Sequence, residues 1–174
     1  MAVEAFAFIY QLELVIYSDS GVSDGVPGSF LTVVLVRSRG HEALDILVQA
    51  VADCGYSDRV QFAIDPASSE FFRDGNYNLG FKGSTPDNRT PTQLRELYHS
   101  LLEKYPVTLI EDPFAENDWD SWTEFNKECE VELVGDDLLV TNTKYVQQAN
   151  DKKACDSMLL KINQIGTITE AIAA

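Results

Sequence analysis

The chain has 174 residues, of which 45% are hydrophobic, and this is enough for one globular domain with a real core. Its formal net charge of −15 would repel a nucleic acid or an anionic membrane surface, so neither is an expected partner. The longest apolar stretch, residues 5–17, is interrupted by Gln11 and Glu13, is too short to cross a bilayer and lacks the basic start of a signal peptide. We therefore predict a cytoplasmic protein.

Residues 1–40 differ in pattern from the rest of the chain. They contain two apolar runs separated by SDSGVSDGVPGS, a linker of turn-forming residues. We leave this N-terminal segment unassigned and expect it to form a hairpin or to cover an exposed sheet edge.

From Glu42 onward, helical patterns alternate with short apolar runs. The apolar residues of the first two helices recur at helical spacing: Leu44, Leu47, Val48 and Val51, and then Leu94, Leu97, Tyr98 and Leu101. The second helix has a clear start, because Thr90, Pro91 and Gln93 match an N-cap, a first-turn proline and a capping-box partner. Three further helices are predicted to begin after Asn117, after Asn142 and near Thr167.

Four short apolar segments predict strands at residues 60–64, 107–110, 131–135 and 157–160. Strands that alternate with helices predict an α/β fold with a parallel sheet. The connection at residues 66–89 is long, and its Asp74-Gly75 pair predicts a small hairpin on the surface of the sheet edge. Long loops of this kind often border a site.

Each predicted strand runs into an ionisable residue. These residues are Asp65, Glu111, Asp136 with Asp137, and Lys161. Because parallel strands end on one face of a sheet, the side chains should converge there. Converging carboxylates repel one another unless they are neutralised, and oxygen clusters suit hard cations such as Mg²⁺. A lysine beside bound metal would have a lowered pKa and would be able to act as a base.

A structural interpretation competes with this one, because an acid after a strand is often the N-cap of the next helix. The four positions lie at intervals of 46, 25 and 25 residues, which is harder to attribute to chance. The pattern alone favours a metal-assisted site without specifying its reaction.

Four segments resemble successive parts of enolase, the phosphopyruvate hydratase of glycolysis. They are FAIDPASSEFF, YPVTLIEDPFAENDWDSW, VGDDLLVTN and MLLKINQIGTITEA. The resemblance covers residues 41–174 and implies a partial (β/α) TIM barrel of the enolase type, with about four βα units. Residues 1–40 form a segment that does not match it.

The resemblance also implies roles for the converging residues. Asp65, Glu111 and Asp136 would bind Mg²⁺, Lys161 would be the catalytic base, and Asp137 would orient that lysine or tune its charge. The implied reaction converts 2-phosphoglycerate to phosphoenolpyruvate and water. The completed protein would be a homodimer.

Two parts of the family pattern are not found in the sequence. VLVRSRGH, before Glu42, does not resemble the family's acidic-glycine loop, and the chain ends at Ala174, before the His-Arg-Ser segment that grips the substrate phosphate. We expect the natural transcript to continue past this point. The alternative is a catalytically inactive enolase fragment, or a protein that binds a metal or a partner.

Overall fold

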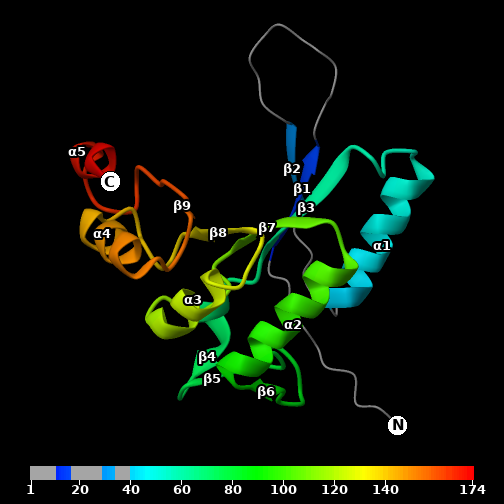
Figure 1. Cartoon of the computed structure of the whole chain (residues 1–174), viewed down its shortest axis with the longest axis horizontal. Helices are drawn as coiled ribbons and strands as arrows, with labels where there is room; N and C mark the ends of the chain where they lie inside the picture. Colours follow the sequence, from blue (N-terminus) through cyan, green and yellow to red (C-terminus); the bar gives the residue numbers. More distant parts are fainter. Residues whose placement is uncertain (1–10, 17–28, 34–39) are drawn as a thin grey trace, which may run out of the picture.

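The computed structural model describes residues 11–16, 29–33 and 40–174 (Figure 1). Its main sheet has six strands in the order β2-β1-β3-β7-β8-β9. The strands are β1 (Gln11–Ile16), β2 (Ser29–Val33), β3 (Val60–Asp65), β7 (Val107–Glu111), β8 (Glu132–Gly135) and β9 (Ser157–Met158). Strands β3, β7, β8 and β9 pair in parallel, which confirms the predicted parallel sheet.

Strand β1 extends the sheet beyond β3. It pairs in antiparallel fashion with β3 on one side and with β2 on the other. The edge of β3 is therefore covered by the N-terminal segment, as expected. Residues 1–10, 17–28 and 34–39, including the predicted linker, lie outside the described residues.

The helices follow one another around the sheet (Figure 1). They are α1 (Gly40–Asp53), α2 (Pro91–Lys104), α3 (Trp119–Asn126), α4 (Thr143–Lys152) and α5 (Ile168–Ala173). The capping box at Thr90 is present, and Asn142 and Thr167 cap the next helices where the sequence predicts. The third predicted helix is capped by Asp118, one residue after Asn117. Four βα units are thus formed, by β3 with α2, β7 with α3, β8 with α4 and β9 with α5.

Two details differ from the sequence-based expectation. Val48 of α1 is 36% exposed, because the buried face of this helix is centred on Ala43 and Leu44. The last strand comprises only the first two residues of the predicted range, and Leu159 and Leu160 are exposed beyond it.

The long connection after β3 forms a short 3₁₀ helix (Ser68–Phe71) and a second, three-stranded sheet. That sheet consists of β4 (Phe72–Arg73), β5 (Asn76–Asn78) and β6 (Asn88–Arg89). Asp74 and Gly75 both have positive φ and connect β4 to β5, which confirms the predicted hairpin.

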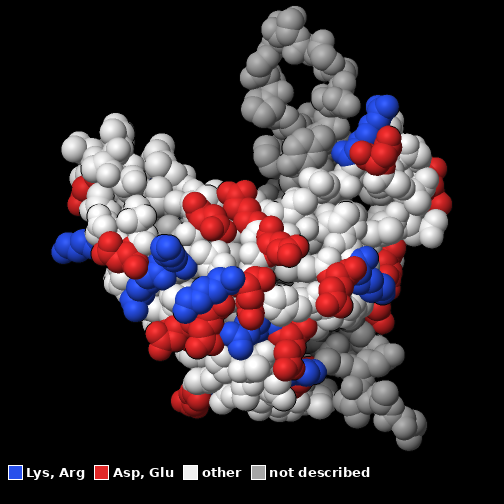
Figure 2. All heavy atoms as spheres, viewed as in Figure 1, with Lys and Arg blue, Asp and Glu red and all other residues white. Residues whose placement is uncertain are grey.

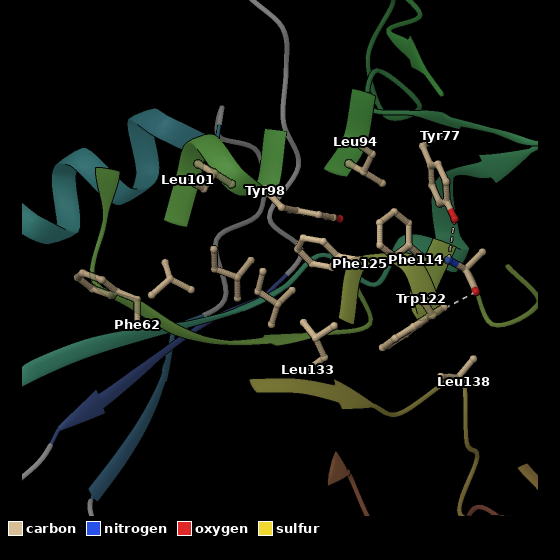
Figure 3. Close-up of a cluster of buried hydrophobic side chains, with 14 of the residues drawn as sticks. Phe62, Tyr77, Leu94, Tyr98, Leu101, Phe114, Trp122, Phe125, Leu133 and Leu138 are labelled. Carbon is tan, nitrogen blue, oxygen red and sulfur yellow. Dashed lines mark hydrogen bonds between the residues drawn. The ribbon is translucent and has the colours of Figure 1, made fainter. Parts of the chain in front are cut away.

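Aromatic packing anchors the segment that leaves β7 (Figure 3). The ring of Phe114 contacts those of Tyr98 and Phe125 edge-on, at centroid distances of 5.9 and 5.6 Å. The Tyr77 hydroxyl accepts a hydrogen bond from the Ala115 backbone N–H at 3.0 Å, and the Trp122 indole donates to the Ala115 carbonyl at 3.2 Å. These contacts fix the chain directly after the two carboxylates that end β7.

Charged side chains of both signs are interspersed on the face shown in Figure 2, where the acidic ones are more numerous. This distribution agrees with the net charge of −15. None of the helices in the described part of the chain is long and apolar enough to cross a membrane.

Candidate active site

Acidic side chains gather at the carboxyl ends of the parallel strands. Among the described residues, Glu111, Asp112 and Asp136 form one group in which a carboxylate oxygen of each lies within 4.8 Å of the others. Two of the three predicted ligands, Glu111 and Asp136, are therefore brought together. They come from neighbouring strands, since Glu111 of β7 pairs with Val134 of β8.

Asp65, the third predicted ligand, is not in this group. It ends β3, whose Ile64 pairs with Ile110, so it leaves the sheet beside Glu111. One of its carboxylate oxygens accepts a hydrogen bond from the Ala67 backbone N–H at 2.8 Å. Asp65 nevertheless interacts electrostatically with the group, because its negative charge contributes to raising the pKa of Asp112.

Asp112 holds two strand ends together. Its side chain is buried, and its two oxygens accept hydrogen bonds from the backbone N–H groups of Asp136 and Asp137 at 3.0 and 2.9 Å. Burial raises the pKa of this carboxyl to about 7, against the opposing effect of the two N–H donors. The two successive acids thus have different roles: Glu111 ends β7, and Asp112, the next residue, holds the segment that carries Asp136.

The backbone turns sharply to make this arrangement. Asp112 has a φ of 42°, a left-handed conformation that is uncommon outside glycine. The carbonyl oxygen of the next residue, Pro113, accepts hydrogen bonds from Ser68 and Tyr98, each at 2.8 Å. The buried partners on either side keep Asp112 in this conformation.

Asp136 follows β8 and is buried, but both of its oxygens have partners. The Lys161 ammonium donates to Oδ2, and the Gln164 amide donates to Oδ1 at 3.1 Å. The hydrogen bond from Lys161 to Asp136 raises the pKa of the lysine. This is opposite to the lowered pKa that we expect beside a bound metal ion. The difference has a simple cause, because here the ammonium itself neutralises the carboxylate.

Gly135 allows the chain to approach closely just before Asp136. A Cβ atom at this position would lie 2.9 Å from the Cγ atom of Leu139. A side chain here would have to displace the buried Leu139, next to the point where β8 leads into Asp136.

Asp137 lies at the edge of the group. Burial raises the pKa of its carboxyl, as does the negative charge of Asp136, while Lys161 lowers it. The lysine and Asp137 are thus close enough to interact electrostatically, but the hydrogen bond from the ammonium goes to Asp136.

Three site residues are missing from the sequence-based set: Asp112, Thr141 and Gln164. Asp112 is adjacent to a predicted ligand, and the doublet of acids before a proline was its only signal. Thr141 and Gln164 are uncharged, so a search for ionisable strand ends passes over them. Gln164 follows Lys161 by three residues, in the resembling segment MLLKINQIGTITEA.

The donor set fits a hard divalent cation. Magnesium takes oxygen ligands, keeps several waters and is commonly held by one or two protein carboxylates. Both oxygens of Asp112 accept fixed backbone N–H groups, whereas one oxygen of Asp136 is engaged by the side-chain ammonium of Lys161, which a cation could replace. Glu111 and Asp136 are therefore the best placed carboxylates in the group.

The family model described as "Enolase, C-terminal TIM barrel domain" matches residues 12–174. The match begins N-terminal to residue 41, where the resemblance starts, and so includes β2 and nearly all of β1. The parallel strands with their outer helices are accordingly part of a (β/α) barrel of the enolase type. The chain belongs to the enolase family through its C-terminal TIM barrel domain.

Proposed function

We propose that this site serves phosphopyruvate hydratase chemistry, the Mg²⁺-dependent conversion of 2-phosphoglycerate to phosphoenolpyruvate and water. The observation that carries the proposal is the position of Lys161, a potential base, against a carboxylate of the candidate metal group. The reaction would place the protein in glycolysis, in the cytoplasm.

Lys161 is the group that would remove the proton from the carbon next to the substrate carboxylate. To accept a proton, its amine must be neutral, whereas the ion pair with Asp136 favours the ammonium form. If Asp136 held a cation instead, Lys161 would lose this partner and its pKa would fall. Cation binding would thereby favour the neutral amine of Lys161 that can accept a proton.

Glu111 and Asp136 would hold the cation, and Asp65 remains the predicted third ligand because it leaves the sheet beside Glu111. When bound, Mg²⁺ supplies positive charge that stabilises the negative charge developing on the substrate carboxylate. Asp112 would keep the loop that carries Asp136 in place, and Asp137 would add negative potential near the lysine.

The test measures the formation of phosphoenolpyruvate from 2-phosphoglycerate in the presence of Mg²⁺. The ultraviolet absorbance of the product reports its formation. We expect Lys161→Ala to reduce turnover at least about 10²–10⁴-fold, the usual effect of losing a positioned proton-transfer group. Lys152→Ala, at the exposed end of α4, is the matched control and should retain wild-type turnover.

A parallel titration with Mg²⁺ separates the two interpretations drawn from the sequence. Binding that disappears in Asp136→Asn, without turnover in the wild-type chain, would favour the inactive metal-binding protein. Turnover that is equal in the wild-type and Lys161→Ala proteins would contradict the role of Lys161.

A further inference from the structure

A chain of uncharged hydrogen-bonding groups ends on the candidate metal ligand Asp136. The hydroxyl of Thr141 donates to Gln164 Oε1 at 2.9 Å, and Gln164 Nε2 donates to Asp136 Oδ1 at 3.1 Å. The same hydroxyl oxygen accepts a hydrogen bond from the backbone N–H of Lys161 at 3.0 Å. Thr141 therefore contacts both the base-bearing segment and the residue that holds the ligand.

The direction of each hydrogen bond follows from the donors and acceptors available. Ionised Asp136 can only accept, so the NH₂ group of Gln164 must face it. The amide oxygen of Gln164 then points away from Asp136 and accepts the single hydroxyl proton of Thr141. A flipped amide would place its oxygen against the carboxylate oxygen and would be repelled.

The backbone conformation at Thr141 indicates that the surrounding structure fixes the position of this hydroxyl. Val140 and Thr141 have φ values of 42° and 53°, so two successive β-branched residues adopt the left-handed conformation. Thr141 is fully buried, and the Val140 N–H donates to the Asp136 carbonyl at 2.8 Å. Strain of this kind persists where the surrounding structure imposes it, and it concentrates at functional sites.

The two oxygens of Asp136 thus have different partners. Oδ1 accepts from the neutral amide of Gln164, and Oδ2 accepts from the charged ammonium of Lys161. If a cation replaced the ammonium, the hydrogen bond from Gln164 to Oδ1 would remain available. Gln164 would then keep the carboxylate in the same orientation before and after the exchange.

We propose that Thr141 and Gln164 are positioning residues for Asp136 and Lys161. They orient the Asp136 carboxylate for a divalent cation and set the position of the Lys161 backbone. The proposal rests on the proposed function, since it assumes that Asp136 is a metal ligand, and it adds two residues with a stated task.

The experiment measures Mn²⁺ affinity without substrate, by calorimetry or from the electron paramagnetic resonance signal of free Mn²⁺. Gln164→Leu removes the donor to Oδ1, and we expect it to weaken Mn²⁺ binding about 10–100-fold, as is typical when a partner of a metal ligand is lost. Gln147→Leu, on the exposed surface of α4, is the matched control and should bind like the wild type.

Two variants of Thr141 separate positioning from stability. Thr141→Val keeps the β-branched shape and removes the hydroxyl, whereas Thr141→Ser keeps the hydroxyl and removes a buried methyl group. We expect Thr141→Val to weaken Mn²⁺ binding and Thr141→Ser to retain wild-type affinity, even if its Tm is the lower of the two. A merely structural role would make affinity follow Tm instead. If Gln164→Leu does not fold, the two Thr141 variants alone test the positioning role.

The outcomes distinguish this proposal from the proposed function. If the wild type binds Mn²⁺, Asp136→Asn does not, and both Gln164→Leu and Thr141→Val bind within twofold of the wild type, the positioning role is wrong and the metal site stands. If the wild type does not bind Mn²⁺, both proposals are overturned.

Discussion

Glu111 and Asp112 are adjacent and chemically alike, yet the structure gives them different tasks. Both belong to the group of carboxylates at the strand ends, but the two oxygens of Asp112 also accept backbone N–H groups from the next strand end. The difference comes from one left-handed residue, which turns the second side chain toward the loop after β8. Asp112 therefore affects the site through the residue it holds.

Replacing Asp112 with asparagine tests this role. The amide keeps the size of the side chain but has only one oxygen, so one of the two buried N–H groups loses its acceptor. We expect the free energy of unfolding to fall by about 1–3 kcal/mol, the usual penalty for an unsatisfied buried donor. Urea denaturation measures the change. Asp58→Asn, at an exposed position, is the control, and equal stability of the two variants would contradict the role of Asp112 in holding the loop after β8.

At the scale of elements, α1 is attached to the end of α2 by a small polar cluster. The Tyr105 hydroxyl contacts the Asp45 carboxylate at 2.9 Å and the His41 carbonyl at 3.1 Å, and Lys104 pairs with the same Asp45. The ring of Tyr105 is buried, so its hydroxyl links an exposed ion pair to the core. This attachment matters because the rest of the contact of α1 with the core is limited to one narrow apolar face.

Tyr105→Phe removes the hydroxyl and keeps the ring. The single proton of the hydroxyl is shared between the Asp45 carboxylate and the His41 carbonyl, and the hydroxyl oxygen also contacts His41 Nδ1 at 3.3 Å. With a net value of about 0.5–1.5 kcal/mol for each hydrogen bond, we expect stability to decrease by about 1–2 kcal/mol. Chemical denaturation should show the loss, and amide hydrogen exchange should locate it in α1. Tyr56→Phe is the control because Tyr56 is 52% exposed. Unchanged exchange in α1 would show that the cluster does not hold the helix.

At the scale of the whole molecule, the sequence predicts the elements better than the geometry of the site. The capping box at Thr90 and the caps at Asn142 and Thr167 depend on neighbouring residues, so local patterns identify them. The convergence of Glu111 and Asp136 also follows, since parallel strands end on one face.

What the sequence does not predict depends on conformation and on long-range partners. Asp112 acquires its role from its backbone angle, and Thr141 and Gln164 meet only after β8 and β9 are paired. Asp65 has the expected register beside Glu111, but a hydrogen bond from its own strand-end turn engages one oxygen, and it lies outside the grouped carboxylates.

The metal site also makes a prediction for the molecule as a whole. Lys161 offsets part of the repulsion among the carboxylates at the strand ends. A cation that binds only the folded state stabilises it further, in proportion to ln(1 + [Mg²⁺]/Kd), about 2.7 kcal/mol at 100 times Kd. We therefore expect Mg²⁺ to raise the Tm. Because the net charge of −15 would be screened by any salt, sodium chloride at matched ionic strength is needed for comparison and should give a smaller rise. Asp136→Asn should reduce the effect of Mg²⁺ to that of sodium chloride, whereas Asp58→Asn should leave it intact. If Asp136→Asn retains the full Mg²⁺-specific rise, the stabilising ion binds elsewhere and the site at these strand ends is wrong.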